Sequence, residues 1–461
     1  MNRTVEPIRR TIAGGPTVVV DRTGLVSLDR ESTISEKRLC TPDLGSTASQ
    51  GALQSFAHRY RYAVRQAVKR TMDYVILVPT LRCNLNCSYC QVSRVNEGTA
   101  GYDWGAAELG NVLAFLGALQ TRSIKIEFQG GEPFLRLDLL EAVRNFCTGH
   151  FDKCSFVVCT NLQNLTPDIL NFIEYPDVFV STSLDGGPGT HTRQRTNDME
   201  LTREFRMNLR EVVSRFGTQK ISALPTVDFL NPPSYEELIT AFTDYGISEI
   251  YLRPINYQGF ARKVFSDVAD NADIWTSYYL GFIDHLIKLN AHAGAPKFSE
   301  YYFSLCLRRI LAAGHDSHVD LRNPNYLAQD YIVIDHDGAF YPTDEARMVT
   351  RTGLIDLSVG DLEHGLNRSK VAQLNQYASN DAFEECRRCP YQAFCGTDIV
   401  DDISRYGTID VPKDQTWFCR VHTAIFDRAF QLLSAKDPDV RFSMNAWAGA
   451  LGKESQLVAG R

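Results

Sequence analysis

Two tight groups of cysteines are the residues of this sequence best suited to chemistry. The first group is Cys83, Cys87 and Cys90, and the second is Cys386, Cys389 and Cys395, followed by Cys419. In a reducing compartment, clustered cysteines more often bind metal than form disulfides. Both groups are therefore predicted to hold metal.

The first group has the spacing Cys83-x3-Cys87-x2-Cys90 and follows a strand-like apolar run directly. Three thiolates can hold three irons of a [4Fe–4S] cubane and leave the fourth iron open as a substrate site, whereas electron-transfer clusters use all four positions. The alternatives are a tetrahedral zinc site or simple buried thiols. Zinc requires a fourth ligand, and no His or Cys occurs in the next dozen residues.

The composition excludes several classes of protein. The chain has 461 residues, is 44% hydrophobic and 22% charged, and carries a formal net charge of −7. An acidic chain is a poor first candidate for binding nucleic acid or anionic membranes. No apolar run approaches the roughly 20 residues that span a bilayer, and the first residues lack the apolar stretch of a signal peptide. We expect a soluble, cytoplasmic protein.

Strand-like and helix-like segments alternate around the first cysteine group. Strands are predicted at 74–81, 124–128, 155–160, 178–184, 221–227 and 249–255. The segments between them, such as 106–120 and 136–147, have the three- and four-residue apolar spacing of covering helices. Six β-α repeats imply an α/β fold with a parallel sheet, and about 180 residues suit a partial (β/α)6 barrel better than a full eightfold barrel.

The pattern divides the chain into four parts. They are a small α+β module at 1–72, the barrel at 73–300, a cysteine-bearing domain at 301–435 and a tail at 436–461. In the first part, the turn at 21–24 predicts a hairpin of strands 17–21 and 25–28, before a helix at 52–71.

The two C-terminal parts have weaker patterns. The segment 331–347 predicts a β-hairpin turning at 335–338, and 419–434 predicts a helix. The tail is expected to be weakly ordered, although its apolar side chains Phe442, Met444 and Trp447 could dock.

The first cysteine group resembles the motif of the radical S-adenosylmethionine (SAM) superfamily, Cys-x3-Cys-x-aromatic-Cys, with Tyr89 as the aromatic residue. Gly130, Gly131 and Glu132 resemble the family's GGEP segment, which implies that they hold the amino group of SAM. Paired glycines let a backbone approach a ligand closely, and a glutamate supplies an anion for an ammonium group.

Further resemblances follow along the barrel. Thr160 and Asn161 resemble the family's TN pair, and 181–186 with Arg195 resembles its SLDG…H…R stretch. The resemblance implies that Ser183 and Asp185 bind the ribose or carboxylate of SAM; the alternative is that Asp185 only caps a helix. Arg253 matches a position that lines the adenine. The activity implied is reductive cleavage of SAM to methionine and a 5′-deoxyadenosyl radical, which takes a hydrogen atom from the substrate.

The second cysteine group resembles the SPASM extension of peptide-modifying radical SAM enzymes. The full pattern supplies seven cysteines for two auxiliary clusters, but Thr343 and Ile399 stand at two of those positions here. Both losses fall on the barrel-proximal cluster. The resemblance therefore implies one complete auxiliary [4Fe–4S] cluster, held by Cys386, Cys389, Cys395 and Cys419, with structural zinc as the alternative. The remaining thiols are interpreted as packing residues, Cys306 as an inert orphan of the lost cluster and Cys40, Cys147, Cys154 and Cys159 as core residues.

Within this group the chain is most similar to the His-Xaa-Ser system radical SAM maturases, over residues 74–430. The residues that carry this similarity are 90–94, Tyr102-Asp103, 126–133, 341–345 and 389–398. The resemblance implies a ribosomally made precursor peptide as substrate, hydrogen abstraction at a side-chain carbon, and a crosslink such as a C–C cyclophane. It also implies an electron donor such as flavodoxin or ferredoxin.

The final proton loss of such a reaction requires a base. Asp344, Glu345 and Asp398 are candidates by position, against the alternative that each is a solvated surface carboxylate. Two rival functions remain. One is oxidation of a Ser or Cys in a protein, as anaerobic sulfatase maturases perform, and the other is a non-catalytic metal-bearing scaffold that binds a peptide.

Overall fold

The structure is a computed structural model. It describes residues 7–20, 26–29, 37–38, 71–259, 261–264, 271–291, 298–311 and 321–449. The helix expected at 52–71, Cys40 and the tail beyond residue 449 lie outside the described residues.

Within the described residues, a sheet of nine strands forms the centre of the molecule, in the order β11-β10-β9-β8-β5-β16-β17-β18-β19. These strands are β5 (Tyr74–Leu77), β8 (Ser123–Phe128), β9 (Lys153–Cys159), β10 (Val178–Ser183), β11 (Ile221–Leu224), β16 (Tyr331–Ile334), β17 (Ala339–Tyr341), β18 (Gly360–Asp361) and β19 (Gly365–Leu366). The strands from β11 to β16 are parallel, and the last three are antiparallel.

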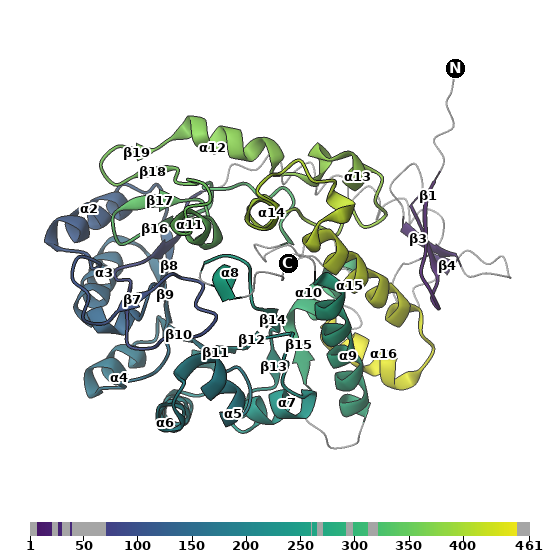
Figure 1. The fold of residues 1–461 in the computed structure, drawn as a ribbon, viewed down its shortest axis with the longest axis horizontal. Coiled ribbons are helices and arrows are strands. Elements are labelled where there is room, and N and C mark those ends of the chain that lie inside the picture. The colour runs from purple at the N-terminus through teal and green to yellow at the C-terminus, as the bar shows by residue number, and fades with distance from the viewer. Residues whose placement is uncertain are drawn as a thin grey trace.

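Helices follow the parallel strands and cover one face of this sheet (Figure 1). They are α2 (Ala106–Gly117), α3 (Leu137–His150), α4 (Pro167–Glu174), α5 (Pro188–His191), α6 (Met199–Phe216) and α7 (Tyr235–Thr243). Strand β8 illustrates why helices cover only one face of the sheet. It buries Ile124, Ile126 and Phe128 on that face, while the alternate residue Glu127 lines the barrel cavity on the other. The inward face of the parallel strands is therefore left for a site.

The sixth predicted strand is wrong in detail. Residues 249–255 split into β13 (Glu249–Ile250) and β14 (Arg253–Pro254), which lie outside the nine-stranded sheet. Each forms a two-stranded pair, β14 with β12 (Thr226–Val227) and β13 with β15 (Ser299–Glu300). The sheet itself gains its sixth parallel strand from β16, on the other side of β5.

Strand β16 also begins the hairpin predicted at 331–347. It pairs antiparallel with β17, and Gly338 in the turn has a φ of 81°. Its parallel pairing with β5, whose paired residues lie 257 positions earlier in the chain, has no counterpart in the local pattern. The hairpin thereby brings α11 (Asp344–Arg351) to the barrel (Figure 1).

The C-terminal part is mainly helical. Its helices are α8 (Ala261–Val264), α9 (Ala272–Ala291), α10 (Tyr301–Leu311), α12 (Arg368–Leu374), α13 (Glu384–Arg387), α14 (Ile399–Tyr406), α15 (Trp417–Ser434) and α16 (Pro438–Trp447). Helix α15 matches the predicted helix at 419–434. The expectation of weak order after residue 436 is wrong as far as residue 449, because α16 buries Met444 and Trp447, and the Trp447 indole donates to the Phe298 carbonyl at 3.0 Å.

The N-terminal residues form a separate antiparallel sheet of β1 (Ile8–Thr11), β2 (Thr17–Val20), β3 (Val26–Asp29) and β4 (Lys37–Arg38). The predicted hairpin is present as β2 and β3. This sheet lies beside α15, far from the barrel (Figure 1). Arg10 donates two hydrogen bonds to Asp427 of α15, at 2.7 and 2.6 Å. Among the described helices, none has the length and apolar character needed to cross a membrane.

Candidate active site

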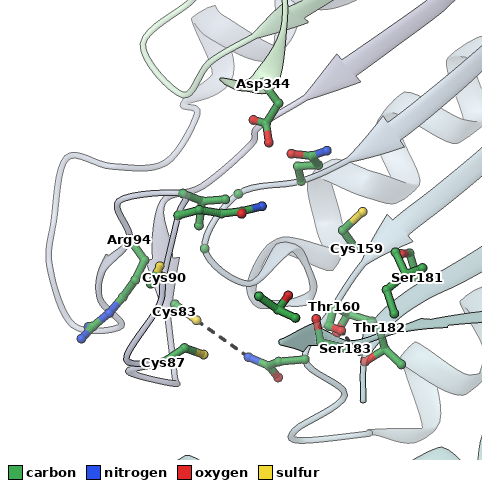
Figure 2. Close-up of a pocket in the computed structure, with 18 of the residues that line it drawn as sticks. Cys83, Cys87, Cys90, Arg94, Cys159, Thr160, Ser181, Thr182, Ser183 and Asp344 are labelled. Atoms are coloured by element: carbon green, nitrogen blue, oxygen red, sulfur yellow. Dashed lines mark hydrogen bonds between the residues drawn. The ribbon is translucent and has the colours of Figure 1, made fainter. Parts of the chain in front are cut away.

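A cavity of about 410 Å³ opens inside the barrel at the carboxyl ends of the parallel strands. Most of the predicted SAM-side residues line it, namely Cys83, Cys87, Tyr89, Cys90, Gly130, Gly131, Thr160, Asn161, Ser183, Arg195 and Arg253, together with the carboxylates Asp344 and Glu345. Figure 2 shows the cysteine loop on one side of this cavity and Asp344 on the other. The structure thus brings together residues from across 270 positions of the chain.

The cysteine loop follows β5 and presents its three thiols to the cavity. The Leu85 amide donates to Cys83 Sγ at 3.4 Å, and Asn161 Nδ2 lies 3.8 Å from the same sulfur. Burial raises the pKa of the Cys83 thiol to about 12. Burial also raises the pKa of the Cys87 thiol, although the nearby Arg195 guanidinium acts to lower it. Thiolates are the ligands that iron–sulfur clusters require, so this loop fits such a group.

The spacing of the sulfurs distinguishes a cluster from a single ion. A tetrahedral zinc holds thiolates about 3.8 Å apart, given its Zn–S distance of about 2.3 Å. Over the described ranges, the one group of three ligand atoms within 4.8 Å of one another is Asp335, His336 and Asp337. Neither cysteine group therefore brings three sulfurs within 4.8 Å of one another.

Gly130 and Gly131 fix the position of the cysteine loop. Gly130 has a φ of 138°, and a Cβ there would lie 2.2 Å from the Thr80 carbonyl oxygen; at Gly131 it would lie 2.1 Å from that of Arg82. The Gly131 amide donates to Thr80 at 3.0 Å. Glycine is thus required at both positions because the backbone passes close to the Thr80 and Arg82 carbonyls. Both glycines also line the cavity.

Glu132 is placed differently from the prediction. It is buried and absent from the cavity wall. Its carboxylate accepts hydrogen bonds from Thr160 Oγ1 and the Asn161 amide, both at 2.8 Å, and from the Phe134 amide at 3.1 Å. Burial raises the pKa of Glu132 to about 7, although these hydrogen bonds act to lower it. Glu132 therefore ties the end of β8 to the end of β9 and orients the Thr160-Asn161 pair.

Tyr89, Asp185 and Arg195 form a buried network behind the cysteine loop. The Tyr89 hydroxyl donates to Asp185 at 2.7 Å and accepts from Arg195 at 2.6 Å. Asp185 also accepts from the Thr226 amide at 2.9 Å. Asp185 does not line the cavity and does not cap α5, whose N-cap is Gly187. The capping role suggested for Asp185 is therefore wrong for α5, and its contact with SAM stays a prediction.

The network gives a first testable prediction. Tyr89→Phe removes both hydrogen bonds and leaves two buried charges without them, so we expect the apoprotein to lose about 2–3 kcal/mol of unfolding free energy. Anaerobic urea denaturation measures this loss. Tyr175→Phe, at a side chain 43% exposed, is the matched control and should have little effect. Equal stability of the two variants would contradict the role assigned to the network.

Ser183 and Arg253 both line the cavity wall, and their contacts with SAM stay predictions. Arg253 packs against the Tyr251 ring, and its buried Nε has no hydrogen-bond partner among the described residues. An arginine with unused donors facing a cavity is suited to binding an anionic or polar ligand.

Among the cavity residues that sequence interpretation missed are Tyr74, Glu127 and Cys159. Tyr74 donates to Glu127 at 2.6 Å, and the Cys159 thiol lies 3.4 Å from the same carboxylate. Cys159 therefore lines the cavity and is not a core packing residue, unlike Cys147 and Cys154. The alternation of inward and outward residues along each strand was the available signal.

The three candidate bases separate in the structure. Asp344 is 8% exposed, so it is not a solvated surface carboxylate. Its carboxylate accepts a hydrogen bond from Arg347 Nε at 2.9 Å and forms an ion pair with Arg347 Nη2 at 2.8 Å. Burial raises the pKa of Asp344, although Arg347 acts to lower it. Glu345 lines the same cavity, whereas Asp398 lines a second one and caps α14. Two of the three carboxylates are thus placed for chemistry beside the cysteine loop.

The second cavity, of about 670 Å³, is lined by all four cysteines of the second group, Cys386, Cys389, Cys395 and Cys419. Burial raises the pKa of Cys386 to about 12 and of Cys419 to about 11. Strand β1 forms part of the wall through Arg10. Four thiols around one cavity match the ligand set of a complete cluster.

The positions without cysteine have other roles. Thr343 caps α11, since its Oγ1 accepts from the Ala346 amide at 3.0 Å. Ile399 belongs to an apolar cluster with Leu327 and Val349. Cys306 is fully buried in α10, and burial raises its pKa to about 12. Thr343 thus serves as a helix cap and Ile399 as an apolar packing residue.

The contact between β1 and α15 gives a second prediction. Arg10→Ala removes the bidentate pair with Asp427, so backbone amides of β1 and β2 should exchange hydrogen faster, with those of β5 unchanged. Because Arg10 is 38% exposed, the loss in unfolding free energy should stay below about 1 kcal/mol. Arg122→Ala, which breaks the exposed pair with Asp152, is the control. Unchanged hydrogen exchange in β1 would contradict the view that the Arg10–Asp427 pair holds β1 against α15.

Residues 77–242 match the family model described as the Radical SAM superfamily. An uncharacterized protein of Methanocaldococcus jannaschii is 34% identical over 117 residues, which are 25% of this chain and 39% of that relative. The chain thus spans well under two thirds of that relative's length.

Solved structures have a similar fold. Native anSMEcpe with bound AdoMet and Cp18Cys peptide superposes with a TM-score of 0.61, at 17% identity, covering 81% of this chain and 99% of that one. Streptococcus suis SuiB bound to precursor peptide SuiA superposes with a TM-score of 0.51, at 13% identity, covering 81% and 82%. These solved structures show the fold, and the matched family model shows that the protein is an enzyme that carries a radical SAM domain at residues 77–242.

Proposed function

We propose that this enzyme modifies a ribosomally made precursor peptide by radical chemistry and forms a crosslink within it, such as a C–C cyclophane. The observation that carries the proposal is the single cavity that joins the cysteine loop to Asp344 and Glu345, 250 or more positions away. SuiB and anSMEcpe, which share the fold, bind peptides in their solved structures.

Cys83, Cys87 and Cys90 are suited to hold a [4Fe–4S] cluster with one iron open. When bound, this cluster and SAM supply a 5′-deoxyadenosyl radical that takes a hydrogen atom from a peptide side chain, at Cβ in our proposal. Ser183 and Arg253 offer polar groups to the ribose and the adenine end of SAM, while Asn161 stands beside Cys83. Buried Glu132 and the Tyr89 network orient these groups.

Asp344 and Glu345 are placed to take the proton that leaves the peptide when the crosslink forms. A buried carboxylate with a raised pKa is a better proton acceptor near neutral pH than a solvated one. Arg347, fully buried behind Asp344, keeps that carboxylate oriented toward the cavity. Asp398 lines the second cavity and not the barrel cavity.

Cys386, Cys389, Cys395 and Cys419 are suited to hold one auxiliary [4Fe–4S] cluster, which would supply one-electron chemistry. We further propose a SPASM-type domain at 301–435, a cytoplasmic location, and flavodoxin or ferredoxin as electron donor. Within such enzymes we place the chain nearest the His-Xaa-Ser system maturases. The N-terminal sheet is proposed to be an accessory module.

Oxidation of a Ser or Cys in a protein is the second candidate, since the fold is similar to that of anSMEcpe. Thr343 and Ile399 disfavour this function. They stand at two cysteine positions of the full SPASM pattern, and sulfatase maturases typically keep both of its auxiliary clusters. Iron and sulfide counting on the anaerobically isolated protein tests the third candidate, a non-catalytic scaffold. About eight irons per chain supports two clusters, whereas zinc without SAM cleavage contradicts the proposal.

Co-expression with short open reading frames that neighbour the gene tests the substrate class. We expect mass spectrometry to find one precursor peptide that loses the mass of two hydrogen atoms per crosslink. The same peptide with Cys395→Ala enzyme should stay unmodified. A wild-type enzyme that cleaves SAM but modifies none of these peptides would contradict the maturase function.

A further inference from the structure

A third, small cavity lies between the two large ones. Its volume is about 30 Å³, and its wall includes Thr343, Asn325 and Ile399. Glu345 lines both this cavity and the barrel cavity, while Thr397 and Asp398 line both this cavity and the one with the four cysteines. The three cavities therefore form a series that starts at Glu345 and ends at Asp398.

Two residues in this wall have unsatisfied polar atoms. Thr397 Oγ1 and Asn325 Oδ1 are buried and, within the part of the chain that the structure describes, have no hydrogen-bond partner. Thr397 is 6% exposed as a whole residue. Buried polar atoms of native proteins are nearly always bonded to protein or to ordered water, so these two atoms indicate a water site.

The volume of the cavity agrees with this interpretation. A buried water needs about 10–15 Å³ of such space and two to four polar partners, so a cavity of about 30 Å³ has room for about two waters. The hydroxyl of Thr343, which accepts from the Ala346 amide, can still donate its own hydrogen. The apolar residues Leu327, Ile399 and Val400 also line this cavity.

We propose that this cavity binds water and that the water connects Glu345 to Asp398, so that it carries the proton released by the peptide out of the barrel cavity. The proposal rests on the proposed function. Removal of two hydrogens sends one hydrogen atom to the 5′-deoxyadenosyl radical and leaves one electron and one proton. The electron passes to a one-electron acceptor of the iron–sulfur class. Glu345 takes the proton, and each water releases one proton as it receives one, until Asp398 is protonated.

The water site is tested without any peptide. In a crystal structure of the anaerobic holoenzyme we expect an ordered water within hydrogen-bond distance of Thr397 Oγ1 and Asn325 Oδ1. Thr397→Val keeps the shape of the side chain and removes the oxygen, and should lose that water. A dry wild-type cavity overturns the inference whether or not the enzyme modifies peptides.

The relay is tested with the modified peptide found by co-expression. Thr397→Val and Glu345→Gln should each lower the ratio of crosslinked peptide to 5′-deoxyadenosine by about tenfold or more, because each removes a group on the proposed proton path. Thr276→Val, at a buried threonine of α9 away from the three cavities, is the matched control. A wild-type ratio in Thr397→Val overturns the relay even where the water is present.

Discussion

Replacing Cys87 by alanine is expected to lower 5′-deoxyadenosine formation at least about 100-fold, which exceeds the effect of removing most outer partners of a metal site. The side chain is one of three thiols that line the barrel cavity, and two thiolates leave a second iron of a cubane without its ligand. Iron content should fall from about eight to about four per chain. Anaerobic iron analysis and chromatography of the SAM products measure both effects.

Cys154→Ala is the matched control for this variant. Cys154 lies on β9, and its thiol donates to the Cys147 carbonyl at 3.3 Å, outside both large cavities. It should keep the full iron content and SAM cleavage. An unchanged iron content in Cys87→Ala would remove the basis for placing a cluster on this loop.

Gly130→Ala is expected to be the most damaging small substitution in the domain. The φ of 138° costs a residue with a Cβ about 1–3 kcal/mol, and the Cβ would lie 2.2 Å from the Thr80 carbonyl oxygen. Relief of that overlap requires a backbone shift, which adds about 1–3 kcal/mol. We expect a loss of at least about 3 kcal/mol in the apoprotein by urea denaturation, together with loss of SAM cleavage.

Gly110→Ala separates this effect from the general effect of removing a glycine. Gly110 is exposed on α2, and a Cβ there meets no atom within 4 Å. This substitution should stabilise the protein by up to about 1 kcal/mol, since alanine is the better helix former. If Gly130→Ala were as stable as Gly110→Ala, the cysteine loop would not be held in the way described.

Local patterns predicted the elements whose signals lie within one segment. Five of the six barrel strands and the helices between them follow from apolar periodicity, because each strand buries one face against a helix. The cysteine spacing and the glycine pair likewise lie within short segments. Their side chains meet in one cavity because parallel strands end at the same edge of the sheet.

Pairings between distant segments were not predictable in this way. Strand β16 is a short buried run, and nothing in its residues specifies β5 as its neighbour. Glu132 illustrates a second limit: its motif placed it in the site, but its direction depends on hydrogen bonds from Thr160 and Asn161. Burial of Asp344 depends on the same long-range pairing, since β17 and α11 follow β16.

The contact between Arg10 of β1 and Asp427 of α15 has a consequence for the order in which the protein folds during synthesis. Arg10 and Asp427 are separated by 417 positions, and β1 forms part of the wall around the four cysteines. Most of the chain must therefore leave the ribosome before this wall can close. The cysteine loop at 83–90 and the strands that support it, apart from β16, are synthesised much earlier. Metal loading of the two sites should consequently occur in sequence, and a bulky fusion at the N-terminus should disturb only the later one.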